Sequence, residues 1–304
     1  MNAAMNSLYD PCAAAGLARG AAAAYGDEGD MAAWARTQGC AGCEVIRDAA
    51  SDTLAFVAAA EDRAFVVFRG TRDLRNWITD LDARRVEWRI GNEELGMEVH
   101  EGFLRALESV WERVAEAAGR MGAGKRDLFF TGHSLGGALA MLAAAGWQEA
   151  SGESPDATGK LPVPPKAWMY SFGQPRVGNA GWARWYDERL GTRSFRVVHA
   201  QDVVARVPWL LGLYRHAGTE IFHDALGMMH QNWPWWAKAP SDAAGLWLEW
   251  RRGKIALLGD HHVSTYVEML NAECERETIL RGHICGSQEC GGQGCGGQTY
   301  LRRS

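Results

Sequence analysis

The 304-residue chain lacks any apolar stretch long enough to cross a membrane as a helix. Its longest apolar run, residues 135–147, is shorter than the roughly 20 residues that a bilayer requires and is interrupted by glycine. The alanine-rich residues 1–24 also lack the basic start and the leucine-rich core of a secretory signal. We therefore expect no transmembrane segment and a cytoplasmic location.

Positive charge is not in excess either. The chain carries 32 Lys and Arg residues against 37 Asp and Glu residues, a net charge of −5, and has no basic run. Binding to nucleic acids and to anionic membrane surfaces depends on clustered basic residues. We therefore expect no nucleic acid partner, and the composition leaves the oligomeric state open.

Paired cysteines suited to a zinc site are scarce. Cys40 and Cys43 form a C-x-x-C pair that could be a disulfide, a metal half-site or two reduced thiols, and no second such pair exists. Cys285, Cys290 and Cys295 recur every five residues in a Gly/Gln-rich tail. The odd total of seven cysteines leaves at least one thiol unpaired or bridging two chains. We expect neither a metal nor a cofactor.

The order of the apolar segments predicts one α/β domain. Strands and helices alternate from residue 128 onward, which favours a mainly parallel sheet with helices on both faces. We expect this domain to span residues 1–280, with a Trp-rich insertion at about 222–258 and a flexible tail at 281–304. The predicted strands are 53–58, 64–68, 128–130, 168–172 and 195–198, the first two forming a hairpin. The predicted helices are 13–36 with a break at 26–30, 101–118, 180–190 and a final helix that opens at 260–262.

A serine on a tight turn is the strongest catalytic signal. The strand at 128–130 runs into Gly132-His133-Ser134-Leu135-Gly136, a G-x-S-x-G pattern, and an Ala/Leu-rich helix follows at once. A serine on a sharp turn from strand to helix takes a strained backbone, which small flanking residues permit. The turn also leaves the next backbone N–H at a helix N-terminus, where it can bind an oxyanion. We expect Ser134 to be a nucleophile and Leu135 to be an oxyanion donor.

An acid and a base follow Ser134 in the chain. Asp202 comes just after the predicted strand 195–198, where catalytic acids of open α/β sheets lie, although a simple turn aspartate is the alternative. Asp260-His261-His262 then opens the final predicted helix. The order Ser, Asp, His is that of one class of hydrolases. We expect His261 or His262 to be the base.

Two further segments have alternative interpretations. Leu74, Trp77, Ile78 and Leu81 form one apolar stripe on a short predicted helix, which is either core or a lid over an apolar cleft. The Trp-rich residues 233–236 are either local core or an exposed aromatic patch at a boundary between apolar and aqueous surroundings.

Several blocks together make the chain resemble the class 3, fungal-type lipases of the α/β-hydrolase fold. The resemblance covers roughly residues 20–222 and 258–270. It rests on Val66–Thr71 with Asn76-Trp77 and Asp80-Leu81, His100-x-Gly102-Phe103, Thr131–Gly137, Phe172–Asn179, Asp202-x-Val204, and Tyr214-x-His216 with Glu220. One departure is Ala205, where the family often has proline after Asp-x-Val.

The resemblance implies roles for residues of this chain. Ser134 would be the nucleophile, Asp202 the acid that orients the base, Thr71 and Leu135 the oxyanion donors, and residues 72–82 the lid. Longer relatives look like Asp-His followed by tyrosine five positions after the histidine, and Tyr266 follows His261 at that spacing. The resemblance therefore favours His261 over His262 as the base.

The implied activity is that of a serine carboxylester hydrolase, a triacylglycerol or acylglycerol lipase that works through an acyl-enzyme. A phospholipase A1 or a small-ester esterase on the same triad is the alternative, and a non-catalytic lipid-binding protein on the same fold is a further one. The expected partner is a lipid or ester substrate. Peripheral association with a lipid surface would accompany a lipase activity.

Overall fold

The computed structural model describes residues 8–71, 84–88, 96–122, 125–150, 166–200, 202, 204–207, 213–234 and 261–286. The predicted lid at 72–82 lies outside these residues, as do residues 151–165, residues 235–258 of the Trp-rich insertion and residues 287–304 of the tail.

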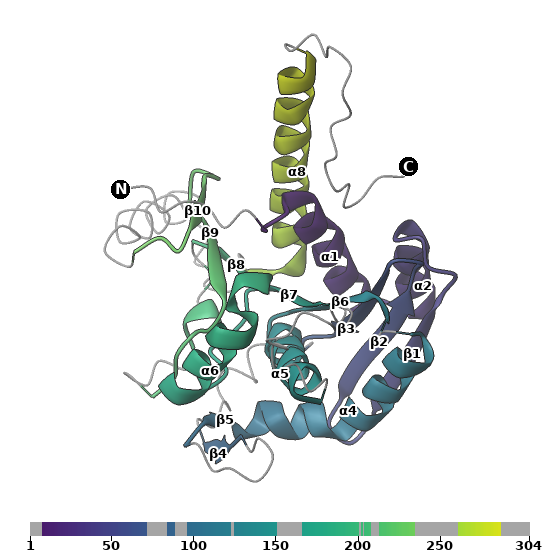
Figure 1. The fold of residues 1–304 in the computed structure, drawn as a ribbon, viewed down its shortest axis with the longest axis vertical. Helices are drawn as coiled ribbons and strands as arrows, with labels where there is room; N and C mark the ends of the chain where they lie inside the picture. Colours follow the sequence, from purple (N-terminus) through teal and green to yellow (C-terminus); the bar gives the residue numbers. More distant parts are fainter. Residues whose placement is uncertain are drawn as a thin grey trace, which may run out of the picture.

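A mainly parallel sheet forms the centre of the described fold (Figure 1), as predicted. It has eight strands in the order β1-β2-β3-β6-β7-β8-β9-β10. Neighbouring strands from β3 to β9 are parallel, whereas β1, β2 and β3 pair antiparallel with one another and β10 pairs antiparallel with β9. The strands are β1 (Cys43–Asp48), β2 (Thr53–Ala59), β3 (Arg63–Phe68), β6 (Asp127–His133), β7 (Ala167–Phe172), β8 (Ser194–His199), β9 (Thr219–His223) and β10 (Met229–Gln231). A second sheet pairs β4 (Arg85–Glu87) with β5 (Glu98–His100).

Helices cover both faces of the large sheet. One core contains residues of α4 (Glu101–Arg120), α5 (Leu135–Ala150) and α6 (Ala180–Leu190). The other contains residues of α1 (Pro11–Ala23), α2 (Glu28–Thr37) and α8 (Val263–Gly286). Short 3-10 helices lie at η2 (Gly191–Arg193) and η3 (Val204–Arg206).

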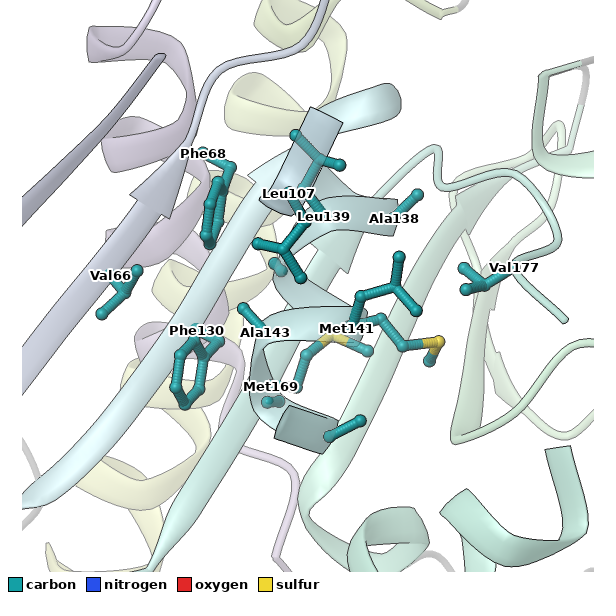
Figure 2. Packing of buried hydrophobic residues seen from close by; sticks show 14 of the residues in the cluster. Val66, Phe68, Leu107, Phe130, Ala138, Leu139, Met141, Ala143, Met169 and Val177 are labelled. Atoms are coloured by element: carbon teal, nitrogen blue, oxygen red, sulfur yellow. The ribbon is translucent and has the colours of Figure 1, made fainter. Parts of the chain in front are cut away.

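Strand β3 shows why the sequence produces these two layers. Successive side chains of a strand point to opposite faces. Val66 and Phe68 therefore join the core under α4 and α5 (Figure 2), while Phe65 and Val67 join the core under α1 and α2. A strand that is apolar on both faces belongs in the middle of a covered sheet, and β3 lies between β2 and β6.

Side-chain caps define where three helices begin. Asp10 accepts hydrogen bonds from the N–H groups of Cys12 and Ala13, at 2.8 and 3.2 Å, and Pro11 opens α1. His100 caps α4 and Asn179 caps α6 in the same way. Each cap satisfies a backbone donor that has no partner inside the helix.

Helix α8 is longer than predicted and is tied to α1. It continues to Gly286, past the predicted start of the tail at 281. Arg281 forms an ion pair with Glu277, one turn earlier, at 2.8 Å, and such pairs support the exposed end of a helix. A disulfide joins Cys12 of α1 to Cys274 of α8, and in Figure 1 the far end of α8 projects beyond the body of the molecule.

The other cysteines and the start of the Trp-rich insertion are partly described. Cys40 and Cys43 are free thiols, and burial raises the pKa of the Cys40 thiol to about 11. Trp233 packs on Phe222 and stacks on His230, with ring centroids 5.5 and 3.8 Å apart. For this one tryptophan, the contacts agree with the interpretation as local core.

Candidate active site

The turn between β6 and α5 has the strained geometry that the G-x-S-x-G pattern predicts. Ser134 has a φ of 58°, in the left-handed region that non-glycine residues rarely occupy. A side chain at Gly132 would meet the backbone of Gly136, and one at Gly136 would meet the carbonyl oxygen of Phe68. Glycine at both positions therefore allows β6, α5 and the end of β3 to approach one another closely.

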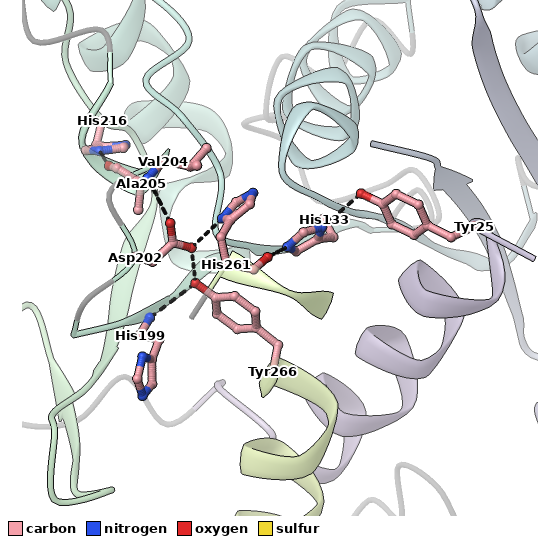
Figure 3. Close-up of polar contacts among 9 residues, drawn as sticks. All are labelled: Tyr25, His133, His199, Asp202, Val204, Ala205, His216, His261 and Tyr266. Carbon is pink, nitrogen blue, oxygen red and sulfur yellow. Dashed lines mark hydrogen bonds and ion pairs between the residues drawn. The ribbon is translucent and has the colours of Figure 1, made fainter. Parts of the chain in front are cut away.

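Asp202 lies fully buried just beyond β8, with both carboxylate oxygens in use. Its Oδ1 accepts hydrogen bonds from the N–H groups of Val204, at 2.8 Å, and Ala205, at 3.3 Å. Its Oδ2 lies 2.7 Å from Nδ1 of His261 and 2.5 Å from the hydroxyl oxygen of Tyr266 (Figure 3). The departure at Ala205 thus supplies a donor that a proline at this position would lack.

Of the two adjacent histidines, His261 is the one that contacts Asp202. Its ring is 2% exposed, whereas His262 is exposed. A carboxylate only accepts hydrogen bonds, so Nδ1 of His261 carries the proton and Nε2 of the neutral ring presents a lone pair. Both this Nε2 and the Oγ of Ser134 are buried, and neither has a hydrogen-bond partner among the residues that the structure describes.

Gly173 packs directly against Asp202 and His261, and the sequence analysis did not single it out. Its φ is +60°, and an added Cβ would lie 2.5 Å from Oδ2 of Asp202 and 2.9 Å from Nδ1 of His261. Any side chain here would push the carboxylate and the imidazole apart. The available signal was the position of Gly173 directly after β7, at the end of the sheet where Asp202 also lies.

Tyr266 contributes a second contact that the sequence analysis missed. The residue is fully buried, as expected for the inner face of α8. Its hydroxyl donates to Oδ2 of Asp202 and accepts from the N–H of His199, at 3.3 Å. Its place five residues after His261 marked a resemblance and did not reveal this bond.

Thr71 and Leu135 lie in segments that meet at the turn. Thr71 follows β3 and is partly exposed, and Leu135 is the first residue of α5. A Cβ on Gly136, next to Leu135, would lie 3.0 Å from the backbone nitrogen of Gly70, next to Thr71. The backbones that carry both residues are therefore in close contact.

Within the part of the chain that the structure describes, no three or more His, Cys, Asp and Glu side chains come together as metal ligands. Among the described helices, none has both the length and the apolar character needed to cross a bilayer.

A family model described as Lipase (class 3) matches residues 65–211, the segment that contains Ser134 and Asp202. Over this segment the chain is similar to the class 3 lipase family. It is 33% identical over 174 residues to secreted mono- and diacylglycerol lipase 1 of Fusarium solani, covering 56% of this chain and 47% of the relative. It is 34% identical over 174 residues to a lipase of Rhizomucor miehei, covering 56% and 44%.

A solved lipase structure has the same fold. The triacylglyceride lipase of Rhizomucor miehei superposes with a TM-score of 0.61 and 26% identity, over 72% of this chain and 83% of that chain. In contrast, the chain spans about half of the length of the Fusarium and Rhizomucor miehei relatives, 47% and 44%.

The prediction of a cytoplasmic location is wrong. The Fusarium relative is named as a secreted enzyme, which contradicts this prediction. The prediction rested on the composition of residues 1–24, whose alanines belong largely to the buried helix α1. The disulfide between Cys12 and Cys274 is also of the kind that persists in oxidising compartments.

Proposed function

We propose that this protein is a serine carboxylester hydrolase that cleaves acylglycerols. Ser134 is the nucleophile, His261 the general base and Asp202 the acid that orients it. The observation that carries the proposal is the bond of 2.7 Å between His261 Nδ1 and Asp202 Oδ2, buried at the same end of the sheet as the strained Ser134. Asp202 keeps the proton on Nδ1, so the Nε2 lone pair is available for Ser134.

The proposed reaction proceeds through an acyl-enzyme. Oγ of Ser134 attacks the ester carbonyl carbon while Nε2 of His261 takes the hydroxyl proton. The tetrahedral intermediate then loses the alcohol, which leaves with the proton from His261. Water attacks the acyl-enzyme in the same manner, His261 takes its proton, and Ser134 recovers the proton as the fatty acid leaves.

The proposed oxyanion hole consists of the N–H groups of Thr71 and Leu135. Its support is the contact between the two backbones that carry these residues. The N–H of Leu135 also lies at the N-terminus of α5, where the helix dipole favours negative charge. The loss of one such donor typically raises the barrier by about 2.7 to 4 kcal/mol.

Acylglycerols are the proposed substrates because the Fusarium and Rhizomucor miehei relatives are named as lipases for mono-, di- and triacylglycerols. A test compares wild type, Ser134→Ala and Ser51→Ala on emulsified tributyrin, on phosphatidylcholine vesicles and on soluble p-nitrophenyl butyrate. We expect Ser134→Ala to lose activity by about 10⁶ in kcat. Ser51→Ala, which removes an exposed serine hydroxyl, should remain fully active.

The outcomes of this comparison are distinct. Activity of Ser134→Ala at the wild-type rate would remove Ser134 from the mechanism. Wild-type activity on the soluble ester alone would indicate an esterase, and activity on phospholipid alone would indicate a phospholipase.

A further inference from the structure

A hydrogen-bonded chain that the proposed mechanism does not use runs beside the active site. The hydroxyl of Tyr25, which follows α1, lies 2.9 Å from Nδ1 of His133. Nε2 of His133 lies 2.6 Å from the main-chain carbonyl oxygen of His261 (Figure 3). His133 is 4% exposed, so its ring lies beside the reacting groups without reaching solvent.

The direction of each bond follows from the acceptor at one end. A carbonyl oxygen only accepts, so Nε2 of His133 must carry a proton. In the neutral ring Nδ1 then has a lone pair, and the Tyr25 hydroxyl must donate to it. The ring is neutral because burial, and then the electrostatic interaction with His261, hold the pKa of His133 well below its usual value.

The chain continues from Tyr25 to the end of strand β3. The hydroxyl oxygen of Tyr25 accepts a hydrogen bond from the backbone N–H of Gly70. A Cβ at Gly70 would collide with this hydroxyl and would lie 2.6 Å from the carbonyl oxygen of His133. Only glycine allows the three groups to come this close.

The two ends and the middle of this hydrogen-bonded series adjoin the three segments that carry the proposed catalytic groups. Gly70 precedes the proposed oxyanion donor Thr71, and His133 precedes the proposed nucleophile Ser134. The far end is the backbone of His261, the proposed base. The bonds run from the Gly70 N–H to Tyr25, from the Tyr25 hydroxyl to His133, and from His133 to the His261 carbonyl.

We propose that Tyr25 and His133 are positioning residues, which hold the oxyanion strand, the nucleophile turn and the backbone of the base in one fixed arrangement. The proposal rests on the function proposed above. Neither side chain needs to touch the substrate or to exchange a proton during the reaction. Their effect is on kcat, because they fix the distance that the proton of Ser134 must cross to reach His261.

The first test replaces Tyr25 by Phe, which removes one hydroxyl and leaves the ring. On soluble p-nitrophenyl butyrate we expect kcat to fall about tenfold, the size that the loss of one hydrogen bond can produce, with KM unchanged. The rate at which a phosphonate probe labels Ser134 should fall by the same factor. Tyr186→Phe is the matched control, because this buried tyrosine also loses one hydroxyl bond, the 2.8 Å contact with Ser194, on the far side of the sheet.

The second test compares His133→Gln with His133→Leu. Glutamine keeps an N–H that can reach the His261 carbonyl, whereas leucine keeps only the volume. We expect the glutamine variant to retain about tenfold more kcat than the leucine variant. Thermal melts of all variants, and assays well below each melting temperature, separate loss of fold from loss of rate.

Two results would overturn the proposal. One is Tyr25→Phe with wild-type kcat and labelling rate. The other is a Tyr25→Phe variant whose kcat falls no more than that of Tyr186→Phe at equal thermal stability. Should the wild type itself hydrolyse no ester and bind no phosphonate, the proposed function would fail, and this result is distinct from both.

Discussion

His261 and Tyr266 converge on the same oxygen of Asp202, through Nδ1 at 2.7 Å and through a hydroxyl at 2.5 Å. Tyr266 comes from the start of α8 and His261 from the turn before it, so this one segment supplies two donors to one carboxylate. The other oxygen is held by two backbone N–H groups. A buried carboxylate with every acceptor site in use is stable as an anion and has one orientation.

Tyr266→Phe should weaken this arrangement without removing any catalytic group. We expect the free energy of unfolding to fall by about 1.5 to 3 kcal/mol, the contribution of a hydrogen bond to a charged group. Urea melts at neutral pH measure this loss. An unchanged unfolding free energy would mean that the hydroxyl and Asp202 do not interact in solution.

Gly173→Ala should abolish most activity through a collision with the acid and base. The new Cβ would lie 2.5 Å from Asp202 Oδ2, and we expect kcat to fall by about 10², because catalysis is sensitive to misplacement of about 1 Å. Gly227→Ala is a matched control, since Gly227 has a φ of +77° and no neighbour within 4 Å of an added Cβ. Both variants should lose about 1 to 2 kcal/mol of stability from backbone strain, and only the first should lose rate.

Reduction of the disulfide between Cys12 and Cys274 should destabilise the protein. The bond joins residues separated by 262 positions, and removal of a long-range disulfide typically costs about 2 to 5 kcal/mol. We expect the melting temperature of the wild type to fall in dithiothreitol, and Cys12→Ser to melt at this lower temperature with or without the reductant. Cys43→Ser, which changes a free thiol, should melt like the wild type. A wild-type melting temperature that is the same with and without the reductant would show that the disulfide is absent in solution.

His133 should make stability depend on pH. Its folded-state pKa lies below its unfolded value because of burial first and the electrostatic interaction with His261 second. The unfolded chain therefore binds a proton that the folded chain does not, and the contribution of neutral His133 is lost as pH falls below about 6.5. Urea melts should show wild type losing up to about 1.4 kcal/mol more per pH unit than His133→Gln between pH 6 and pH 5. Parallel pH dependence of the two proteins would contradict a neutral buried His133.

Much of the site was visible in the sequence because its parts are local patterns. The turn at Ser134 depends on neighbouring glycines, and the position of Asp202 follows from the strand before it. The choice between His261 and His262 did not follow from such patterns, because both adjoin the same helix start. The resemblance favoured His261, and in the structure its ring contacts Asp202 while that of His262 is exposed.

What the sequence concealed are contacts between distant segments. The spacing of Cys12 and Cys274 in the sequence does not indicate that they form a disulfide. In the same way, no pattern around Tyr25 or Tyr266 predicts the partner of its hydroxyl group. Strands β1, β9 and β10 were also not predicted. β1 and β10 are the two edge strands of the sheet. The residues of each are only partly buried, so their sequences show no clear alternation of apolar and polar residues.

The most direct test of the account is a map of the phosphonate adduct by mass spectrometry. We predict one adduct, on the peptide that contains Ser134, at a rate that falls sharply in His261→Ala and stays at the wild-type level in His262→Ala. An adduct on another serine, or equal labelling of wild type and His261→Ala, would contradict the central claim that Ser134, His261 and Asp202 act together.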